Sequence, residues 1–491
     1  MAKLHRDLRN KEFWYRDILL VCNRLPDFER DEVDLTTKLS RNITLKTPFV
    51  SSPMDTVTGS QMAIMMALMG AIGVIHYNYE TIDEQMEEVE KVKRFEAAFV
   101  KKPVVLSPKN KVEDVYQIAQ KFGFYSVPIT EDGTINSKLV GIITHRDVRY
   151  LETKKEMKIP LSKIMTPREK LITAPKEKTL DKNDIRAANK IIRKYNLDTL
   201  PIVDKNFRIV ALVTDSDLRK NETYPLATKD ENKQLKVLVA VESRLVLAKE
   251  RIKRAVEAGA DGIVLDASVV FKEQLEIARF AKKHFPRLEV ILGNVDSGKM
   301  VEEVMKNANS IVDGLRVGIG PGAACITQEY LGIGRAQGSA VWDCSQAAKK
   351  LAKKSGFKIP IIADGGIRKP SDIIKALALG AETVMMGGLL AGLEESPGEA
   401  EFDEEKGYLV KKYRGMGSLE AMEKRGAFRY GIEKMEIKVP EGKVTKVGYK
   451  GSGYIFIHKL IAAVKQGMQK LGTRNLSTLQ KIAEIIPNSL S

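Results

Sequence analysis

The chain has 491 residues, of which 43% are hydrophobic and 29% are charged, a composition typical of a globular protein with a large core. Its three cysteines, Cys22, Cys325 and Cys344, are too few and too scattered for a disulfide scaffold or a zinc cluster. No apolar run approaches the roughly 20 residues that span a bilayer, and the first residues lack the apolar core of a signal peptide. We therefore expect a cytoplasmic protein with no membrane partner.

The net charge is +16, from 80 Lys and Arg against 64 Asp and Glu. Three explanations fit such an excess: a nucleic-acid partner, a lysine-rich proteome, or a positive field that attracts small anionic substrates. The lysines occur in scattered pairs mixed with acidic residues, and aromatic residues make up only 6%. This pattern disfavours a nucleic-acid partner and leaves the other two explanations open.

Strand-like and helical patterns alternate from the start of the chain, as in parallel α/β folds. The first strand-like run spans residues 48–55 and precedes a helix rich in Met and Ala at about 60–70. The second run spans residues 72–76 and precedes a charged helix that continues to about residue 95.

Between about residues 99 and 220 the pattern changes to two similar halves. Strand-like runs lie at 125–130 and 139–144 in the first half, and at 198–203 and 209–214 in the second. Such a repeat predicts two copies of one strand–helix–strand unit packed as a pair. We expect the copies at about 99–152 and 159–220.

Each half of the repeat carries a Thr-x-x-Asp signal after its last strand, Thr144 with Asp147 and Thr214 with Asp217. The repeat resembles a tandem CBS-domain pair, in which the threonine hydroxyl and the aspartate carboxylate bind the ribose of an adenine or guanine nucleotide. The alternative is that these residues only cap a turn and the helix that follows.

From about residue 222 the first pattern resumes, with amphipathic helices such as 244–258 and 370–380. Six strand-like runs follow, at 237–241, 262–266, 289–294, 315–318, 359–364 and 383–386. Together with the two early runs they make eight, which predicts an α/β fold, a (β/α)₈ TIM barrel. The barrel would comprise residues 1–98 and 222–491, with the CBS pair inserted after its second unit.

The chemistry of such a barrel lies at the carboxyl ends of its strands. The sixth run leads into a glycine-rich segment, 318–327, that carries Cys325. A cysteine on such a loop is a candidate nucleophile, although a packed cysteine is the commoner case. Cys344 lies on a helical pattern and Cys22 lies near apolar residues, so we expect both in the core.

Two paired-glycine turns end the seventh and eighth runs, Gly365-Gly366 and Gly387-Gly388. In TIM barrels the loops after these two strands commonly bind phosphate through backbone N–H groups. A cysteine loop beside a phosphate site suggests a nucleotide that is attacked covalently.

The motifs then resemble the IMP dehydrogenase / GMP reductase family, and its dehydrogenase branch in particular, over nearly the whole chain. The matching segments are 51–57, 320–327, 363–367, 395–399 and 413–418. The resemblance implies an enzyme that oxidises IMP to xanthosine monophosphate with NAD in guanine nucleotide biosynthesis, and a homotetramer.

The resemblance also implies the catalytic roles. Cys325 would attack C2 of IMP, hydride would leave to NAD, and water would hydrolyse the resulting thioimidate. Arg429, beside Tyr430 on a mobile flap, would be the general base, although free arginine has a pKa near 12.5–13.8. Thr327 and Glu441 would form a second proton relay.

The binding residues follow from the same resemblance. Substrate would be held by Ser52, Met54, Asp364, Gly365, Gly366, Gly387, Gly388, Tyr413, Gly415, Met416, Gly417 and Glu441. The cofactor would be held by Asp266, Ser268, Asn294, Gly318 and Gly320, and a potassium ion by carbonyl groups of Gly320, Gly322 and Cys325.

The sequence departs from the family pattern where Ala267, Ala323 and Gly388 replace the usual serines. It also ends at Ser491 without the tail that helps to bind potassium in many members. The sequence therefore does not decide whether the chain has a potassium site.

Two other functions stay open. Segments 293–303, 386–392 and 441–443 resemble GMP reductase, which uses NADPH and releases ammonia. The replaced serines would also suit a non-catalytic regulator that senses nucleotides through the CBS pair. The arginine and tyrosine of the flap favour the dehydrogenase, because hydrolysis of a thioimidate needs a group that activates water.

Overall fold

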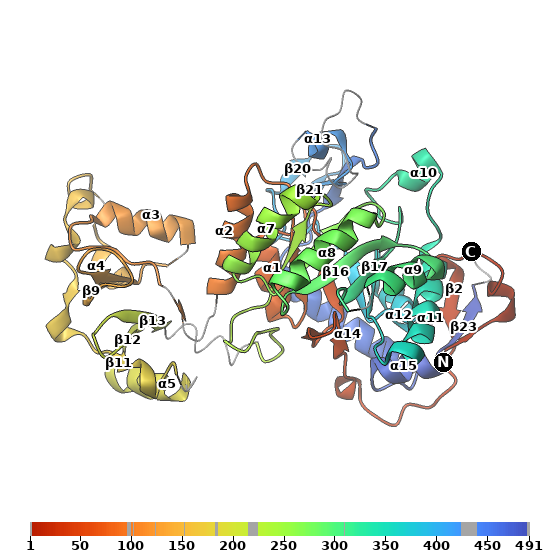
Figure 1. Cartoon of the computed structure of the whole chain (residues 1–491), viewed down its shortest axis with the longest axis horizontal. Coiled ribbons are helices and arrows are strands. Elements are labelled where there is room, and N and C mark those ends of the chain that lie inside the picture. Colours follow the sequence, from red (N-terminus) through yellow and green to blue (C-terminus); the bar gives the residue numbers. More distant parts are fainter. Residues whose placement is uncertain are drawn as a thin grey trace. The chain divides into compact units, whose positions relative to one another are not determined.

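The structure is a computed structural model that describes residues 2–95, 100–101, 103–122, 124–151, 153–181, 185–214, 224–308, 310–423 and 439–488. The chain forms two compact units. Unit 1 comprises residues 1–93, 226–228 and 236–491, and unit 2 comprises residues 94–225 and 229–235. Figure 1 shows the elements of both units.

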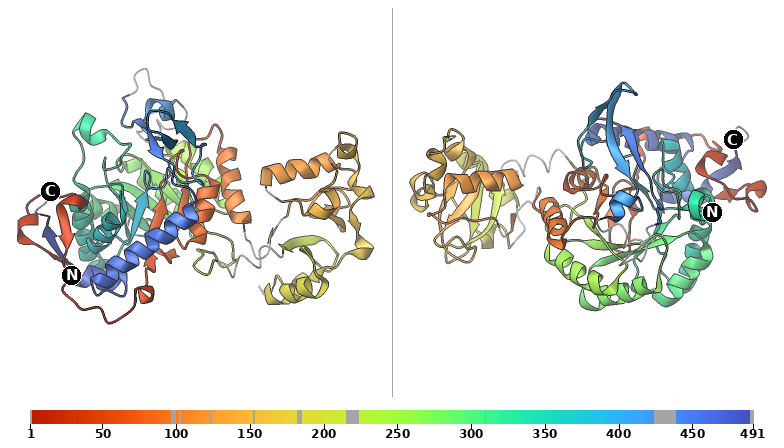
Figure 2. Two further views of the ribbon diagram at one scale, coloured as in Figure 1. Left: turned by 180° about the vertical axis from the view of Figure 1, so that it is seen from behind. Right: turned by 90° about the horizontal axis from the view of Figure 1, so that it is seen from above.

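Eight parallel strands close into a barrel at the centre of unit 1, in the order β14-β15-β16-β17-β18-β19-β5-β6. Their bounds are β5 Phe49–Ser51, β6 Ile72–Ile75, β14 Leu238–Val241, β15 Gly262–Asp266, β16 Glu289–Val295, β17 Gly314–Val317, β18 Ile361–Asp364 and β19 Thr383–Met386. Each coincides with a strand-like run of the sequence, β16 and β17 extending one residue beyond theirs, so the predicted TIM barrel is confirmed. The right-hand view of Figure 2 shows the strands ringed by helices.

The barrel strands are apolar along their length because parallel strands are covered on both faces. Every residue of β15 is buried, for example. Val50, Val74, Val264 and Ile362 belong to one cluster of fully buried side chains inside the barrel. This packed interior holds the strand ends, and the loops that follow them, in fixed positions.

Helices cover the outside of the barrel. They are α1 Ser60–Leu68, α2 Ile82–Arg94, α7 Leu245–Glu257, α8 Lys272–His284, α9 Gly298–Ala308, α11 Gln337–Ser355 and α12 Pro370–Ala378, whereas the short helix α10 Thr327–Leu331 lies in the cysteine loop with only Thr327 buried. In α2 the buried residues include Met86, Val89 and Val92, spaced three residues apart as an amphipathic helix requires. Cys344 is buried in α11, as predicted.

The remaining elements of unit 1 extend the barrel. They are β1 Lys3–Leu4, β2 Ile18–Leu20, β3 Thr37–Lys38, β4 Thr44–Leu45, β20 Glu401–Asp403, β21 Tyr408–Arg414, α13 Leu419–Met422, β22 Val444–Gly448, α14 Gly453–Lys470, α15 Leu476–Ile482 and β23 Glu484–Pro487. Strands β20, β21 and β22 form an antiparallel sheet, and β20, β21 and α13 lie at the top of the barrel in Figure 1.

The prediction that Cys22 is a core residue is wrong, because its side chain is exposed. The residue follows β2, an edge strand that pairs only with β23 in the small sheet β1-β23-β2. Leu19 of the same strand is also 44% exposed. Apolar neighbours in sequence did not imply burial here, because an edge strand leaves part of its surface in solvent.

Unit 2 contains two sheets, β10-β9-β8 and β11-β12-β13-β7. Its elements are β7 Val100–Lys101, α3 Val112–Phe122, β8 Val127–Thr130, β9 Leu139–Ile143, α4 His145–Val148, β10 Thr166–Pro167, β11 Ala174–Pro175, α5 Ile185–Tyr195, β12 Thr199–Val203 and β13 Ile209–Thr214. Each half of the sequence repeat thus supplies a helix followed by two antiparallel strands.

The first Thr-x-x-Asp signal forms a local hydrogen-bonded turn at the start of α4. The backbone N–H and the hydroxyl of Thr144 donate to Oδ2 of Asp147, at 2.7 and 2.9 Å. The geometry is that of a helix cap. Asp217 of the second signal lies outside the described residues.

We expect the Asp147→Ala substitution to lower the free energy of unfolding of unit 2 by about 1 kcal/mol, because it removes this cap. Denaturant unfolding of the full chain, followed by far-UV circular dichroism, measures the change. Asp147→Asn keeps an acceptor oxygen and should lose less. Equal stability of the alanine variant and the wild type would contradict the capping role.

No helix in the described ranges is long and apolar enough to cross a membrane.

Candidate active site

The loops at the carboxyl ends of the barrel strands surround a cavity of about 100 Å³. Its lining comes from residues far apart in the sequence: Ser52, Met54, Asn294, Arg316, Gly318, Gly320, Pro321, Gly322, Ala324, Cys325, Asp364, Gly365, Tyr413, Gly415, Met416, Gly417 and Glu441. Most of the residues predicted to bind substrate or cofactor are therefore brought together. The cysteine predicted as the nucleophile lies among them.

Cys325 is linked to a carboxylate through one hydroxyl. Its Sγ lies 3.2 Å from Oγ1 of Thr327, and that hydroxyl donates to Oε2 of Glu441 at 2.6 Å. Thr327 is 5% exposed, so the link is largely shielded from bulk water. Such a chain can move a proton between the cavity and Glu441, which is the arrangement that general acid–base catalysis needs.

Backbone hydrogen bonds tie the cysteine loop to two other segments. The N–H of Ile326 donates to the carbonyl of Glu441, and the N–H of Lys443 donates to the carbonyl of Ala324, each at 2.9 Å. Gly417 accepts from the N–H groups of Glu441 and Gly442, each at 3.0 Å. Glu441 thus has its position fixed from both sides.

Arg316 links two carboxylates at the base of the cavity. Its guanidinium contacts Oδ1 of Asp266 and Oδ2 of Asp364, each at 2.7 Å. The Nδ2 atom of Asn294 donates to the same Asp364 oxygen at 2.9 Å and to the carbonyl of Gly318 at 2.6 Å. The side chains of Arg316 and Asp266 are 1% and 0% exposed, so the contact is strong and poorly screened.

The sequence pattern places Arg316 in a strand but indicates no function for it. The available signal was a charge inside the otherwise apolar run 315–318. Lys and Arg are almost never fully buried unless they are paired. The partners themselves were not readable from the pattern, because they lie 50 and 48 residues away.

Tyr413 closes one side of the cavity. Burial raises the pKa of its phenol, and the nearby Asp364 and Cys325 raise it further. The phenol therefore stays protonated at neutral pH and can act as a hydrogen-bond donor. Its hydroxyl lies 3.8 Å from Sδ of Met54, which lines the cavity from the loop after β5.

The two pairs of glycines differ in backbone conformation, and only the first pair has positive φ values. Gly365 and Gly366 have φ values of +91° and +74°, a region that residues with a Cβ rarely occupy. Gly387 and Gly388 lie against Tyr413, and a Cβ on either would come within 3.0 or 3.3 Å of it. A serine at position 388, usual in the family, would therefore crowd the tyrosine ring.

Several predicted residues lie away from the cavity wall. Asp266 is buried beneath it, and Ser268 lies half-buried after β15. Of the residues that stand where the family usually has serine, Ala267 is buried and Ala323 is exposed. The predicted flap residues Arg429 and Tyr430 lie outside the described residues.

The fold and the cavity define the class of protein: a (β/α)₈ barrel with a cysteine-centred site at the carboxyl ends of its strands. The family model for the IMP dehydrogenase / GMP reductase domain matches residues 12–491. The chain belongs to this family, as its motifs predicted.

Known relatives cover almost the whole chain. An inosine-5′-monophosphate dehydrogenase from Schizosaccharomyces pombe is 42% identical over 96% of this chain and 87% of its own length. One from Aquifex aeolicus is 41% identical over 96% and 92%. Among solved structures, a GMP reductase from Trypanosoma brucei in complex with guanosine 5′-monophosphate is 29% identical, with a TM-score of 0.85 over 99% of this chain and 97% of that one.

Proposed function

We propose that the chain is an NAD-dependent IMP dehydrogenase that serves guanine nucleotide biosynthesis. The hydrogen-bonded chain from Cys325 through Thr327 to Glu441 carries the proposal, together with the dehydrogenase relatives. The thiol of Cys325 would lose its proton as its sulfur bonds to C2 of IMP, and the hydride on C2 would pass to bound NAD, which becomes NADH. Water then adds to the thioimidate, the C–S bond breaks, and xanthosine monophosphate and the thiol are released.

The second half of this reaction needs a group that removes a proton from water. Thr327 and Glu441 can do this from their place beside the sulfur, because the threonine hydroxyl already donates to the carboxylate. Arg429, with Tyr430, is the proposed base on the flap. The substrate would be held by the cavity residues, with Gly366, Gly387 and Gly388 on its phosphate side.

The cavity has a free acceptor that suits the cofactor. Oδ1 of Asn294 is buried and has no hydrogen-bond partner within the described residues. It can accept from a carboxamide or a ribose hydroxyl, and Gly318 and Gly320 beside it leave room for a close approach. When bound, NAD supplies the acceptor for the hydride. Asp266 and Ser268 are proposed as further residues on this side.

A potassium ion is proposed at the cysteine loop. Backbone carbonyl oxygens are ligands that potassium prefers, and the proposed ones belong to Gly320, Gly322 and Cys325. The carbonyl of Gly322 already accepts from the N–H of Cys325 at 3.1 Å, but a carbonyl has a second lone pair. Among the described residues, no group of three or more His, Cys, Asp or Glu side chains could hold a metal.

The proposal is tested by mixing the purified chain with IMP and NAD, and separately with GMP and NADPH, while following absorbance of the reduced cofactor. Formation of NADH only in the first mixture is the expected result. Consumption of NADPH only in the second mixture would overturn it.

GMP reductase is the second candidate, and a similar solved structure supports it. The T. brucei reductase aligns over nearly the whole chain at a TM-score of 0.85. The dehydrogenase relatives share more of the sequence, at 40–42% identity against 29%. Both enzymes of the family would use the cysteine, so the assay above decides between them.

Unit 2 is proposed to be the CBS pair and to bind an adenine or guanine nucleotide. The repeated arrangement of a helix and two antiparallel strands supports this. Thr144, Asp147, Thr214 and Asp217 are the proposed ribose contacts. If the chain neither forms NADH from IMP and NAD nor consumes NADPH with GMP, but still binds a nucleotide, it would instead be a regulator.

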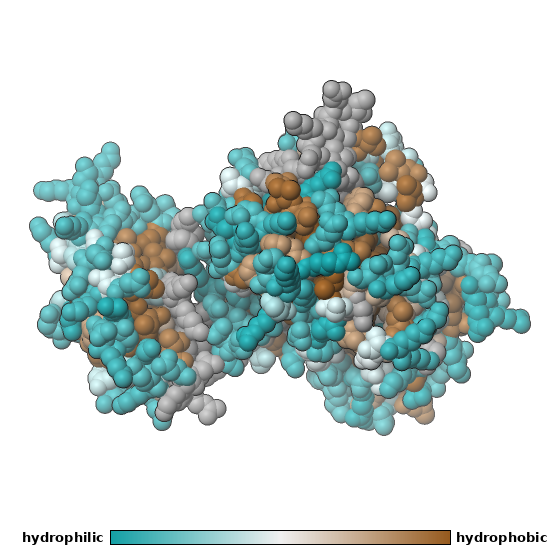
Figure 3. All heavy atoms as spheres, in the orientation of Figure 1, coloured by the Kyte–Doolittle hydropathy of each residue, from teal (hydrophilic) through white to brown (hydrophobic). Residues whose placement is uncertain are grey.

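The chain is also proposed to form a homotetramer in the cytoplasm. Apolar side chains follow the cysteine loop on and after α10, where Tyr330, Leu331 and Ile333 are 62%, 42% and 56% exposed. Figure 3 shows apolar atoms in the part of the surface where α10 lies. Exposed apolar patches of this kind mark protein interfaces.

Light scattering after gel filtration should therefore give about four times the 54.8 kDa of one chain. Replacing Leu331 and Ile333 with serine should shift the mass toward smaller assemblies. A monomer in the wild-type protein would contradict the proposed assembly. Replacing the exposed Val246 on α7 provides a control that should leave the mass unchanged.

A further inference from the structure

Two segments that are distant in the sequence form adjoining parts of the cavity wall, since the hydroxyl of Tyr413 lies 3.8 Å from Sδ of Met54. Ser52 and Met54 belong to the loop after β5, and Tyr413 and Met416 belong to the end of β21 and the loop after it. Their position relative to each other therefore shapes the cavity beside Cys325.

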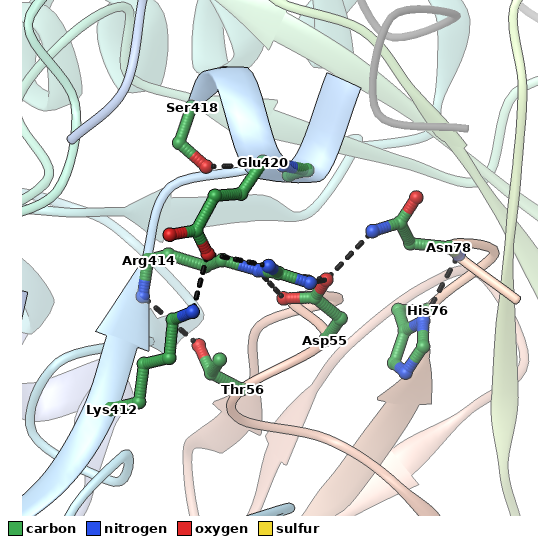
Figure 4. Close-up of polar contacts among 9 residues, drawn as sticks. Asp55, Thr56, His76, Asn78, Lys412, Arg414, Ser418 and Glu420 are labelled. Atoms are coloured by element: carbon green, nitrogen blue, oxygen red, sulfur yellow. Dashed lines mark hydrogen bonds and ion pairs between the residues drawn. The ribbon is translucent and has the colours of Figure 1, made fainter. Parts of the chain in front are cut away.

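A largely buried ion pair joins these two segments, and its side chains, Asp55 and Arg414, line a second pocket of about 410 Å³. Nη2 of Arg414 lies 2.5 Å from Oδ2 of Asp55, and Nε lies 3.1 Å from both carboxylate oxygens. The two side chains are 17% and 8% exposed. Arg414 also donates its backbone N–H to Oγ1 of Thr56 at 3.2 Å. Figure 4 shows the guanidinium lying along the carboxylate.

The carboxylate is held from a third element as well. Nδ2 of Asn78, after β6, donates to Oδ2 of Asp55 at 2.7 Å, and the N–H of Asn78 donates to Nδ1 of His76 at 3.0 Å. Burial disfavours the charged carboxylate, but hydrogen bonds and the charge of Arg414 outweigh it and lower the pKa of Asp55. Asp55 is thus ionised throughout the neutral range, and the pair is intact there.

Asp55 and Arg414 do not line the cavity beside Cys325. They flank residues that do, since Met54 precedes one and Tyr413 precedes the other. We propose that Asp55 and Arg414 are a positioning pair that holds the Met54 and Met416 segments in place against each other, and thereby sets the affinity for the purine nucleotide. This inference rests on the proposed function. A bidentate arginine suits the task because its planar fork fixes orientation as well as distance.

Arg414 has a second carboxylate partner that provides a matched control. Its Nη1 donates to Oε2 of Glu420 at 3.0 Å, and Glu420, which is 45% exposed, also pairs with Lys412. Figure 4 shows this contact on the side of Arg414 away from Asn78. Glu420 lies on α13 and does not join β21 to the loop after β5. Its loss removes an ion pair of Arg414 without releasing the two segments.

The test compares Asp55→Asn, Arg414→Gln and Glu420→Gln in the full chain. The first two should raise KM for IMP about tenfold, with kcat at saturating IMP reduced less than threefold. Glu420→Gln should leave both values within twofold of the wild type. Titration calorimetry with IMP alone should show the same loss of affinity, and thermal unfolding confirms that each variant is folded. Arg414→Lys keeps the charge but loses the fork, and should recover only part of the affinity.

The double variant Asp55→Asn/Arg414→Gln shows whether the two residues act on KM together or independently. If the pair acts as one unit, its KM should match that of the worse single variant rather than the product of both effects. Multiplying effects, unchanged KM in folded Asp55→Asn, or an equal defect in Glu420→Gln would overturn the inference. A wild-type chain that does not oxidise IMP would instead overturn the proposed function, and calorimetry with GMP would then test the pair.

Discussion

Replacing Cys325 with alanine should reduce NADH formation from IMP and NAD by at least about 10³-fold, because the variant cannot form the covalent intermediate. No other cysteine reaches the cavity, since Cys22 is exposed after strand β2 and Cys344 is buried in α11. The neighbouring Thr327 hydroxyl cannot substitute, because an alcohol is far less acidic than a thiol. Initial rates at saturating IMP and NAD measure the effect.

Cys22→Ala serves as the control and should keep the wild-type rate. A second measurement follows the thiol itself: alkylation of Cys325 by iodoacetamide should be slowed by IMP and detected by peptide mass spectrometry. A Cys325→Ala variant that retains a tenth or more of the wild-type rate would refute covalent catalysis.

The Arg316→Met substitution should destabilise unit 1 by about 3–5 kcal/mol, because it leaves buried carboxylates without their shared cation. Asp266 has a fully buried side chain, and that of Asp364 is only 14% exposed. The same change should lower kcat/KM for IMP by on the order of 10²-fold, since Asp364 lines the cavity and would lose its orientation. Denaturant unfolding and steady-state kinetics measure the two effects.

Arg316→Lys separates charge from geometry. A lysine restores one positive charge but cannot contact both carboxylates at once, so we expect most of the stability and only part of the activity to return. If Arg316→Met unfolds at the wild-type denaturant concentration with unchanged kinetics, the two contacts are not important for the site. Loss of activity in both variants at full stability would assign Arg316 to direct contact with a ligand.

The eight barrel strands could be predicted because their pattern is local. A strand covered on both faces is a short apolar run, and a helix between two such strands shows its apolar face every three or four residues. The glycine turns were equally readable, because positive φ values at Gly365 and Gly366 restrict the choice of residue. Burial of Cys22 could not be judged this way, because it depends on whether β2 lies at an edge.

The cavity was predicted as a set of residues, and family resemblance supplied most of its members. The contacts that give those residues their chemistry lie between distant segments: Thr327 and Glu441 are 114 positions apart, and Asp55 and Arg414 are 359 apart. The roles of Arg316, Asp55 and Arg414 were not foreseen. A charged residue in a sequence shows neither its burial nor its partner.

The sequence by itself therefore determined the barrel and the loop that carries the cysteine, because burial periodicity and backbone freedom are properties of neighbouring residues. Only the tertiary structure decided which carboxylates pair with Arg316 and Arg414 and which hydroxyl contacts the thiol of Cys325. Closure of the barrel brings the ends of all eight strands to one side, and the resulting distances depend on register and loop path rather than on any local pattern.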